Sequence, residues 1–256
     1  MKERKPTMQD SLRVIAEAGV EVEVVLDVGV LTGTQPLIDV FPRVRHHLFE
    51  PVDLHFPVIE KNYRNLDYKL HHVALSDSVG TSYLALKSIH GTSQITHAQV
   101  TPRMVTADDV PGLVSCKEIT RTTLDALMQD EGLTGGVLLK VDVDGHEIPI
   151  LKGAQEVLTK AAVVVVEAPL NRTKMPAFFL RSNFLIERGF LLQDVVDLAY
   201  YDGVLWQADL VFVRADLAME HDRLRPFEAP GFQFDPQRWF PLGEAAFAPP
   251  GDKPRE

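Results

Sequence analysis

The chain has 256 residues, enough for one large α/β domain, and 45% of them are hydrophobic, as is ordinary for a globular core. Its 26 basic and 36 acidic residues give a net charge of −10, which argues against nucleic acid because a phosphate backbone needs a basic partner. A single cysteine, Cys116, excludes an intramolecular disulfide, and no apolar run approaches the roughly 20 residues that span a bilayer. We therefore expect a cytoplasmic protein without a membrane partner, acting on small neutral or cationic molecules.

The first expected elements are a helix and a buried strand. Thr7 caps the helix and Gly19 ends it. Residues 22–28 are almost all apolar and mostly β-branched, which is typical of a strand buried on both faces of a parallel sheet. We place this strand at the centre of an α/β sheet.

A glycine loop follows this strand. Asp27 stands near the end of the strand, Gly29 and Gly33 bracket the loop, and Pro36 suits the first turn of a helix. Ligands of open α/β sheets bind beyond the carboxyl ends of the strands, where glycine lets the backbone approach them. The pattern therefore predicts a cofactor cradle, in which Gly29 either needs a positive φ or lies against the ligand. It is not the G-x-G-x-x-G dinucleotide fingerprint, and by itself it also fits a plain turn.

A second strand is expected over 44–51, and it ends in Glu50. Glu50 lies 23 residues after Asp27 (50 − 27 = 23). Nucleoside-binding α/β folds carry an acid for the ribose hydroxyls about 20 residues after the loop. A carboxylate suits this task because it only accepts hydrogen bonds and can take both hydroxyls. The plainer alternative is a surface glutamate before Pro51.

A helix over 55–65 and a third strand running into a turn over 68–77 continue the alternation. Ser76 and Asp77 close this turn, where we expect the adenine edge of a cofactor. From 79 to 112 the alternation breaks, and we expect this insertion to lie over the site. Its polar side chains that could meet a substrate are His90, Ser93, Gln94 and His97.

Two pairs of adjacent histidines lie in the second and third strands: His46 with His47, and His71 with His72. Adjacent residues of a strand point to opposite faces, so neither pair can chelate one metal ion. We interpret all four as structural.

The second informative stretch covers residues 136–158. A buried strand ends in Lys140, Asp142 and Asp144, and strand alternation places these three on one face unless the turn begins before Asp144. Glu147 then opens a helix, where its charge suits the helix dipole.

The next strand, over 161–170, is as apolar as the first and also ends in an acid. Helix capping explains one or two such acids but hardly all of them. The acids at the ends of four strands are Asp27, Glu50, Asp142 and Glu167.

The domain is expected to end near residue 215. A helix stops at Gly189, and strands near 190–195 and 206–213 form an antiparallel hairpin that closes the sheet. Residues 216–256 are rich in proline, and we expect them to form an ordered wrap or a tail.

Six blocks occur in the order LDVGVLTGT, LFEP, VALSD, TTLDALM, LLKVDVDGHEIPILKGA and ADLVFVR. Over 24–214 the chain thereby resembles the FkbM family of S-adenosylmethionine-dependent methyltransferases, most specifically in the KVDVDGHE and LKGA segments. The resemblance implies an α/β class I methyltransferase (Rossmann-like) fold: a seven-stranded, mostly parallel sheet with helices on both faces and an antiparallel last strand. The chain departs from the family at Val30 and Leu31, where Ala-Asn is usual, so the asparagine that would bond the cofactor is missing.

A methyltransferase must hold an acceptor in line with the methyl group and remove its proton. Our first candidate for positioning or base work is Asp142, followed by Glu167 and His146. Lys140 either pairs with a carboxylate or acts as a catalytic lysine with a lowered pKa. The residues expected to bind the cofactor are Asp27, Gly29, Val30, Gly33, Glu50, Pro51, Ala74, Ser76, Asp77 and Asp142.

The implied cofactor is S-adenosylmethionine, and the expected partner is a small-molecule acceptor, such as a sugar or secondary-metabolite hydroxyl. Mg²⁺ held by Asp142, Asp144 and Glu167 is a less favoured alternative, so no metal site is assigned. The oligomeric state stays open, with a homodimer as one option. Two rival functions remain: a nicotinamide-dependent oxidoreductase and a non-catalytic adenosylmethionine-binding protein.

Overall fold

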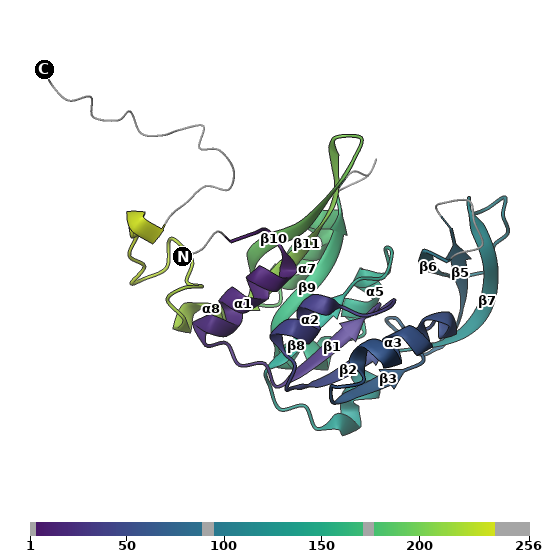
Figure 1. Cartoon of the computed structure of the whole chain (residues 1–256), viewed down its shortest axis with the longest axis horizontal. Helices are drawn as coiled ribbons and strands as arrows, with labels where there is room; N and C mark the ends of the chain where they lie inside the picture. The colour runs from purple at the N-terminus through teal and green to yellow at the C-terminus, as the bar shows by residue number, and fades with distance from the viewer. Residues whose placement is uncertain (1–3, 89–94, 171–176, 239–256) are drawn as a thin grey trace, which may run out of the picture.

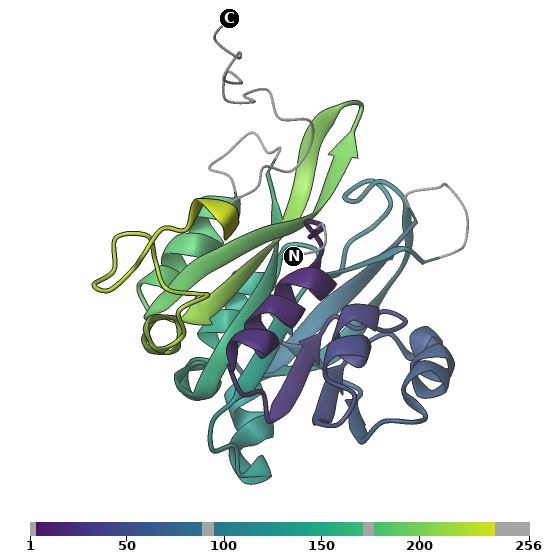
Figure 2. The same ribbon diagram turned by 60° about the vertical axis from the view of Figure 1, so that its left-hand side comes forward.

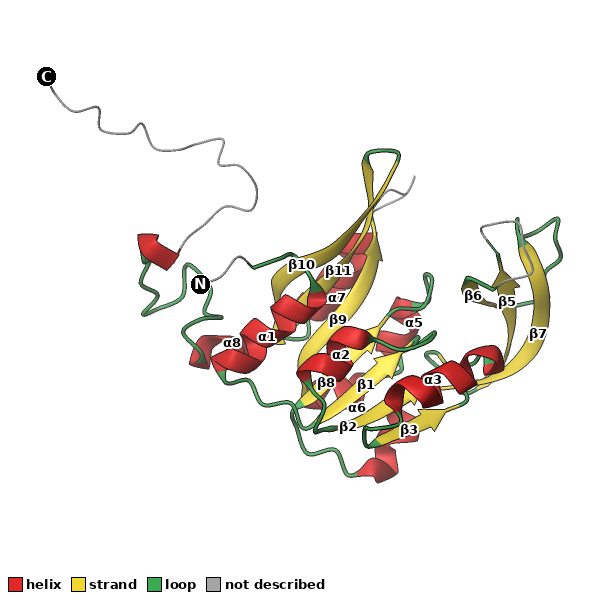
Figure 3. Cartoon of the chain, viewed as in Figure 1, coloured by secondary structure: helices red, strands yellow, loops and turns green. Residues whose placement is uncertain are grey.

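A computed structural model of the chain describes residues 4–88, 95–170 and 177–238 (Figures 1 and 3). A seven-stranded sheet forms its centre. The strands of this sheet are β1 (Val24–Val28), β2 (Arg45–Phe49), β3 (Tyr68–His71), β8 (Val137–Val141), β9 (Ala161–Pro169), β10 (Phe190–Tyr201) and β11 (Val204–Arg214). Their order across the sheet is β10-β11-β9-β8-β1-β2-β3.

The direction of the strands confirms the expected mostly parallel sheet. β1 pairs in parallel with β2 and β8, and β9 continues the parallel run beside β8. β11, the last strand, is antiparallel to both β9 and β10. The hairpin strands are longer than predicted, because the turn is confined to Asp202 and Gly203, both of which have positive φ.

Helices cover both faces of this sheet, as expected (Figure 1). On one face lie α1 (Met8–Ala18), α2 (Gln35–Val40), α3 (Phe56–Tyr63) and α8 (Ala215–Glu220). On the other lie α4 (Leu124–Met128), α5 (Glu147–Lys152), α6 (Gln155–Lys160) and α7 (Ala177–Ile186). Short 3₁₀ helices are η1 (Asp53–His55), η2 (Gln129–Glu131) and η3 (Pro236–Arg238).

The predicted caps of α1 are both present. The Thr7 side chain accepts a hydrogen bond from the Asp10 backbone N–H, and Gly19 ends the helix at φ 104°. Leu12 and Ile15 are fully buried on the helix face that packs toward Val25 of β1. This helix thus covers the central strand that leads into the glycine loop.

The strand predicted over 68–77 is in fact two elements. β3 stops at His71, and β4 (Ala74–Leu75) leaves the first sheet to pair with β7 (Leu113–Thr122). With β5 (Gly80–Lys87) and β6 (His97–Thr101), these form a four-stranded second sheet in the order β4-β7-β5-β6. His90, Ser93 and Gln94 lie outside the described residues.

The second sheet stands beside the carboxyl ends of β1, β2 and β8 (Figures 1 and 2). Leu84 and Leu86 of β5 pack on Val52, which follows β2 directly. Beyond β11, Ala218 of α8 and Leu224 join the apolar cluster over α1. No helix among residues 4–88, 95–170 and 177–238 is long and apolar enough to cross a membrane.

Candidate active site

A cavity of about 250 Å³ lies where the carboxyl ends of the parallel strands meet the second sheet. Both sheets supply its walls. Predicted cofactor or catalytic residues that line it are Gly29, Glu50, Pro51, Ala74, Asp142, His146 and Glu167. Residues of the second sheet that line it include Leu84, His97, Ala98 and Val100. The location is the one that open α/β sheets use for ligands.

The glycine loop passes very close to the strand end of β8. Gly29 has φ 81°, and a Cβ built on it would lie 1.8 Å from the Asp142 carbonyl oxygen. Its need for glycine therefore comes at least from the positive φ and from the nearby Asp142 backbone. A side chain at Gly29 would displace Asp142, so Gly29→Val tests folding as well as binding.

The two residues that depart from the family pattern point in different directions. Val30 is 2% exposed and packs with Leu48 and Tyr63, and its side chain does not line the cavity, so any contact with a cofactor would come from its backbone. Leu31 does line it, with 47% of its surface exposed and φ 54°. A leucine in this left-handed region is unusual, whereas asparagine is tolerated there.

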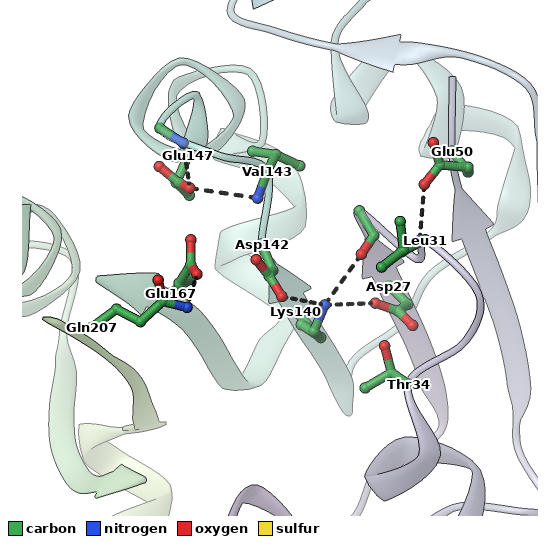
Figure 4. Close-up of polar contacts among 12 residues, drawn as sticks. Asp27, Leu31, Thr34, Glu50, Lys140, Asp142, Val143, Glu147, Glu167 and Gln207 are labelled. Atoms are coloured by element: carbon green, nitrogen blue, oxygen red, sulfur yellow. Dashed lines mark hydrogen bonds and ion pairs between the residues drawn. The ribbon is translucent and has the colours of Figure 1, made fainter. Parts of the chain in front are cut away.

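Lys140 connects the glycine loop to the end of β8 (Figure 4). Its Nζ lies 3.4 Å from the Asp27 carboxylate, 3.3 Å from the Asp142 carboxylate and 3.4 Å from the Gly29 carbonyl oxygen. Burial lowers the pKa of Lys140, but Asp142 and Asp27 outweigh this and raise it overall. Lys140 is thus a charged side chain that bridges two carboxylates. The alternative of a catalytic lysine with a lowered pKa is wrong, because the pKa of Lys140 is raised.

Asp27 is fully buried and does not reach the cavity. Besides Lys140, it contacts the Tyr63 hydroxyl, which donates to Asp27 at 3.3 Å and accepts from the Thr34 N–H at 3.1 Å. Asp27 therefore supports the loop from beneath. We did not predict a role for Tyr63, because an aromatic residue on a helix gives no local sign of a contact 36 residues away.

Glu50 is held in one orientation by the backbone. One carboxylate oxygen accepts from the Leu31 N–H at 2.9 Å and the other from the Val52 N–H at 2.9 Å. The residue is 4% exposed and lines the cavity. Burial raises the pKa of Glu50 to about 7, and the nearby Asp27 adds to the rise. Each oxygen keeps a lone pair for a further donor.

A row of acids continues from Asp142 to the hairpin. Glu167 on β9 accepts a hydrogen bond from the Gln207 side chain at 2.6 Å and lies in register with Asp209 on β11. Burial raises the pKa of Glu167 to about 8 and that of Asp209 to about 7, and in each the Asp142 charge adds to the rise. We did not predict Asp209, although it is the one acid within β11.

Asp144 follows the second of our two alternatives, in which the turn begins before this residue and removes it from the face of Lys140 and Asp142. β8 ends at Val141, and Asp144 lies in the turn with φ 52°. One of its carboxylate oxygens accepts from the Ala98 N–H of β6 at 3.1 Å, and the other lies 3.8 Å from the His97 ring. In the described part of the chain, no three His, Cys, Asp or Glu side chains gather closely enough to hold a metal ion.

The turn after β8 is fixed from inside by Glu147. This fully buried carboxylate accepts from the Gly145 N–H at 2.9 Å and the Val143 N–H at 3.4 Å, and it pairs with Arg181 of α7. The predicted interaction with the helix dipole is thus a small part of its role. Arg181 lies 34 residues later in the chain, so no local pattern could reveal this pair.

Ser76 and Asp77 lie behind the cavity rather than in its wall. Ser76 Oγ is 3.0 Å from the His146 ring and accepts from Arg121 at 3.1 Å. Asp77 pairs with Arg121 at 3.2 Å. Of these four side chains, only His146 lines the cavity, and burial lowers its pKa.

The histidines of β2 and β3 make structural contacts, as we interpreted them. The His46 ring bonds the Phe41 carbonyl at 2.9 Å, and the rings of His47 and His71 contact each other at 3.0 Å. Burial lowers the pKa of all three. His72 stacks on Phe56 outside the cavity.

Several solved structures are similar to this chain. A precorrin-6y C5,15-methyltransferase from Geobacter metallireducens GS-15 is 11% identical, with a TM-score of 0.41, 83% of this chain covered and 91% of that one. An rRNA methylase from Streptococcus thermophilus is 10% identical, with a TM-score of 0.44 and coverages of 84% and 98%. The N-methyltransferase NodS from Bradyrhizobium japonicum WM9, in complex with S-adenosyl-l-homocysteine, is 10% identical, with a TM-score of 0.43 and coverages of 81% and 85%.

A search of curated proteins found no match. The family model described as the methyltransferase FkbM domain matches residues 27–192, from Asp27 on β1 into β10. This span is more than half of the chain and includes the glycine loop, the second sheet and the four acids at the strand ends. The chain belongs to the FkbM family of methyltransferases, with the class I fold that the strand order and the antiparallel last strand display.

Proposed function

We propose that the chain transfers the methyl group of S-adenosylmethionine to a hydroxyl of a small molecule, such as a sugar or a secondary metabolite. The observation that carries this proposal is Glu50. Its carboxylate is buried in the cavity wall at the end of β2, held by two backbone N–H groups, with lone pairs left for ribose hydroxyls. A surface glutamate would have no reason to be fixed in this way.

The acids at the other end of the cavity suit the charge of this cofactor. When bound, S-adenosylmethionine supplies an activated methyl group on a sulfonium cation. The carboxylates of Asp142 and Glu167 line the cavity. Burial and then the Asp142 charge raise the pKa of Glu167, and a bound cation would relieve this repulsion. With the ribose on Glu50, the sulfonium belongs at this acidic end.

Asp142 is the group that we place at the transfer step. Its side chain is 41% exposed, lines the cavity and is oriented by Lys140 at 3.3 Å. It can therefore orient an acceptor hydroxyl or take its proton. Glu167 holds a proton up to about pH 8 in the ligand-free protein and is the second candidate, since a base with a pKa near the working pH is efficient.

The net charge of −10 favours a small neutral or cationic acceptor over nucleic acid. A non-catalytic adenosylmethionine-binding protein remains the second candidate function, because Leu31 occupies the position where the family has a cofactor-binding asparagine. Formation of a methylated product distinguishes the two.

Calorimetric titration with S-adenosylmethionine, S-adenosylhomocysteine and NAD⁺ tests the cofactor assignment. We expect both sulfur nucleosides to bind, and Glu50→Ala to weaken them by ~1.5–3 kcal/mol, the worth of hydrogen bonds to a charged group. Glu60→Ala on the exposed side of α3 serves as the matched control and should change nothing. Binding of NAD⁺ in place of the sulfur nucleosides would establish the oxidoreductase alternative.

Asp142→Asn tests the transfer step, because it keeps the shape and removes the charge. With radiolabelled S-adenosylmethionine and a panel of sugars and glycosides, we expect single-turnover methylation to fall ~10²-fold or more while cofactor affinity changes less than ~5-fold. Equal losses in both would make Asp142 a cofactor or structural residue. Loss of wild-type activity in EDTA with recovery in Mg²⁺ would make it a metal ligand.

A further inference from the structure

His146 lines the cavity beside apolar residues. Ala74, Leu75 and Ile150 line the cavity as well. Ala74 and Leu75 directly precede Ser76, whose hydroxyl contacts the His146 ring, and the Ile150 N–H donates to the His146 carbonyl. With the ribose on Glu50 and the sulfonium among the acids, we place the adenine base beside these apolar residues. This placement rests on the proposed function.

The His146 ring is connected to a chain of hydrogen bonds behind the cavity wall. Arg121 of β7 lies 3.1 Å from Ser76 Oγ, and Ser76 Oγ lies 3.0 Å from His146 Nε2. Arginine only donates hydrogen bonds, so the serine oxygen accepts from Arg121. Ser76 keeps its own proton and one further lone pair, so the direction of its contact with His146 depends on which acceptor takes the proton.

Two acceptors compete for this proton: His146 Nε2 at 3.0 Å and an Asp77 oxygen at 3.4 Å. The same Asp77 oxygen already accepts from Arg121 at 3.2 Å and from the Ser78 hydroxyl at 2.9 Å. The shorter distance and the satisfied Asp77 oxygen both favour donation to His146.

The donation determines the tautomer of His146. A ring nitrogen that accepts a hydrogen bond carries no proton, so the proton of the neutral ring must reside on Nδ1. Burial lowers the pKa of His146, and Arg121 lowers it further while Glu147 and Asp77 oppose this, so the ring is neutral near pH 7. Within the part of the chain that the structure describes, Nδ1 makes no hydrogen bond.

We propose that His146 is held as the Nδ1–H tautomer by Arg121 and Ser76 and donates this hydrogen to a ring nitrogen of the cofactor's adenine. His146 is then a hydrogen-bond donor that determines base specificity. It is not the general base that the sequence suggested as one option, because the nitrogen left for a ligand already carries its proton. Arg121 and Ser76 are positioning residues.

The tautomer is measured without any ligand, by long-range ¹H–¹⁵N spectra of protein labelled at its nine histidines. The resonance that disappears in His146→Phe is assigned to His146. We expect its proton on Nδ1 in the wild type and on Nε2, or exchanging between the two, in Ser76→Ala. A wild-type ring protonated at Nε2, or a tautomer unchanged by Ser76→Ala, overturns the proposal.

Recognition of the base is measured with the 1-deaza, 3-deaza and 7-deaza analogues of S-adenosylhomocysteine, each of which lacks one ring acceptor. In the wild type, we expect one analogue to bind about tenfold more weakly than S-adenosylhomocysteine, and this difference to fall below about twofold in His146→Phe. His72→Phe, which alters an exposed histidine stacked on Phe56, is the matched control and should keep the full difference.

Equal binding of all three analogues to the wild type, or a difference that survives in His146→Phe, overturns the adenine contact. If His146→Phe does not fold, Ser76→Ala takes its place, with the same expected loss of discrimination. Failure of S-adenosylhomocysteine itself to bind the wild type would refute the proposed function, whereas the tautomer measurement would still report on Arg121 and Ser76.

Discussion

Individual residues determine how the proposed cofactor binds, and Glu50 should make its affinity depend on pH. Burial raises the pKa of Glu50 to about 7, and ribose hydroxyls donate best to the ionised carboxylate. Affinity for S-adenosylhomocysteine should therefore rise about tenfold per pH unit below about pH 7 and level off above it. Calorimetry of the wild type and Glu50→Gln measures this, and the variant should lose that slope. Parallel pH profiles of the two proteins would show that another group titrates.

Leu31 gives a second prediction at this scale, because its backbone has φ 54°. The left-handed region costs a residue such as leucine about 1–2 kcal/mol, and asparagine is favoured there. Leu31→Asn should raise the free energy of unfolding in urea by ~0.5–1 kcal/mol, and Leu31→Val should lower it because β-branched side chains fit this region worst.

Leu54→Asn is the matched control for this change, since Leu54 is 63% exposed in η1 and has no positive φ. We expect no gain in stability from it. A Leu31→Asn variant that is no more stable than Leu54→Asn would show that the loop is not strained at this position.

The residues that the sequence could reveal are those whose role follows from their place on a strand. Glu50 and Asp142 directly follow β2 and β8, which the sequence predicts as strands, so their position at the cavity could be predicted from the local sequence. Tyr63, Arg181 and Asp209 gain their roles from partners on other elements. No periodicity in the sequence encodes such contacts between elements, nor does it show that the Val30 side chain packs against Leu48 and Tyr63.

At the scale of elements, the sequence predicted the parallel strands well and the second sheet poorly. Strands buried on both faces are continuous apolar runs, as β8 and β9 are. β4 has two residues, and β7 shows only intermediate or exposed positions without strict alternation, so neither carries a strand signal. The break in the alternation thus indicated an insertion, but the sheet that it forms was not foreseen.

The attachment of this sheet to the site can be tested at Asp144. β6 is an edge strand, and the Asp144 carboxylate accepts from its Ala98 N–H at 3.1 Å. Asp144→Ala removes this acceptor and should accelerate amide hydrogen exchange at Ala98 about tenfold, since a lost hydrogen bond of this kind is worth ~1–3 kcal/mol. Asp144→Asn keeps an acceptor oxygen and should behave like the wild type. Unchanged exchange in both variants would mean that the sheet is held by its apolar contacts alone.

At the scale of the whole molecule, the buried acids work against stability. Glu50, Glu167 and Asp209 have pKa values raised mainly by burial, to about 7, about 8 and about 7. In the unfolded chain such groups titrate near pH 4. Above about pH 6.5 the unfolded state has lost these protons while the native state still binds some of them. The free energy of unfolding must therefore fall as pH rises toward about 8.

The effect of the acids on stability can be separated from that of the buried histidines by the choice of pH range. Burial lowers the pKa of His46, His47, His55, His71 and His146, so their effect on stability has the opposite sign and fades above about pH 7.5, where histidines of the unfolded chain have also lost their protons. Thermal unfolding between about pH 7.5 and 8.5 consequently reports mainly the acids.

We expect Tm to fall across this range, with each retained proton contributing up to about 1.4 kcal/mol per pH unit. Glu167→Gln, which removes the highest of these pKa values, should flatten the decline, whereas Glu60→Gln on the exposed surface of α3 should not. Added S-adenosylmethionine should stabilise the wild type more at about pH 8 than at pH 6.5, because its sulfonium meets acids that have become charged. A Tm that is constant or rises over this window would show that the acids are ionised and compensated within the protein itself. The cavity would then hold no uncompensated negative charge to favour a cationic cofactor.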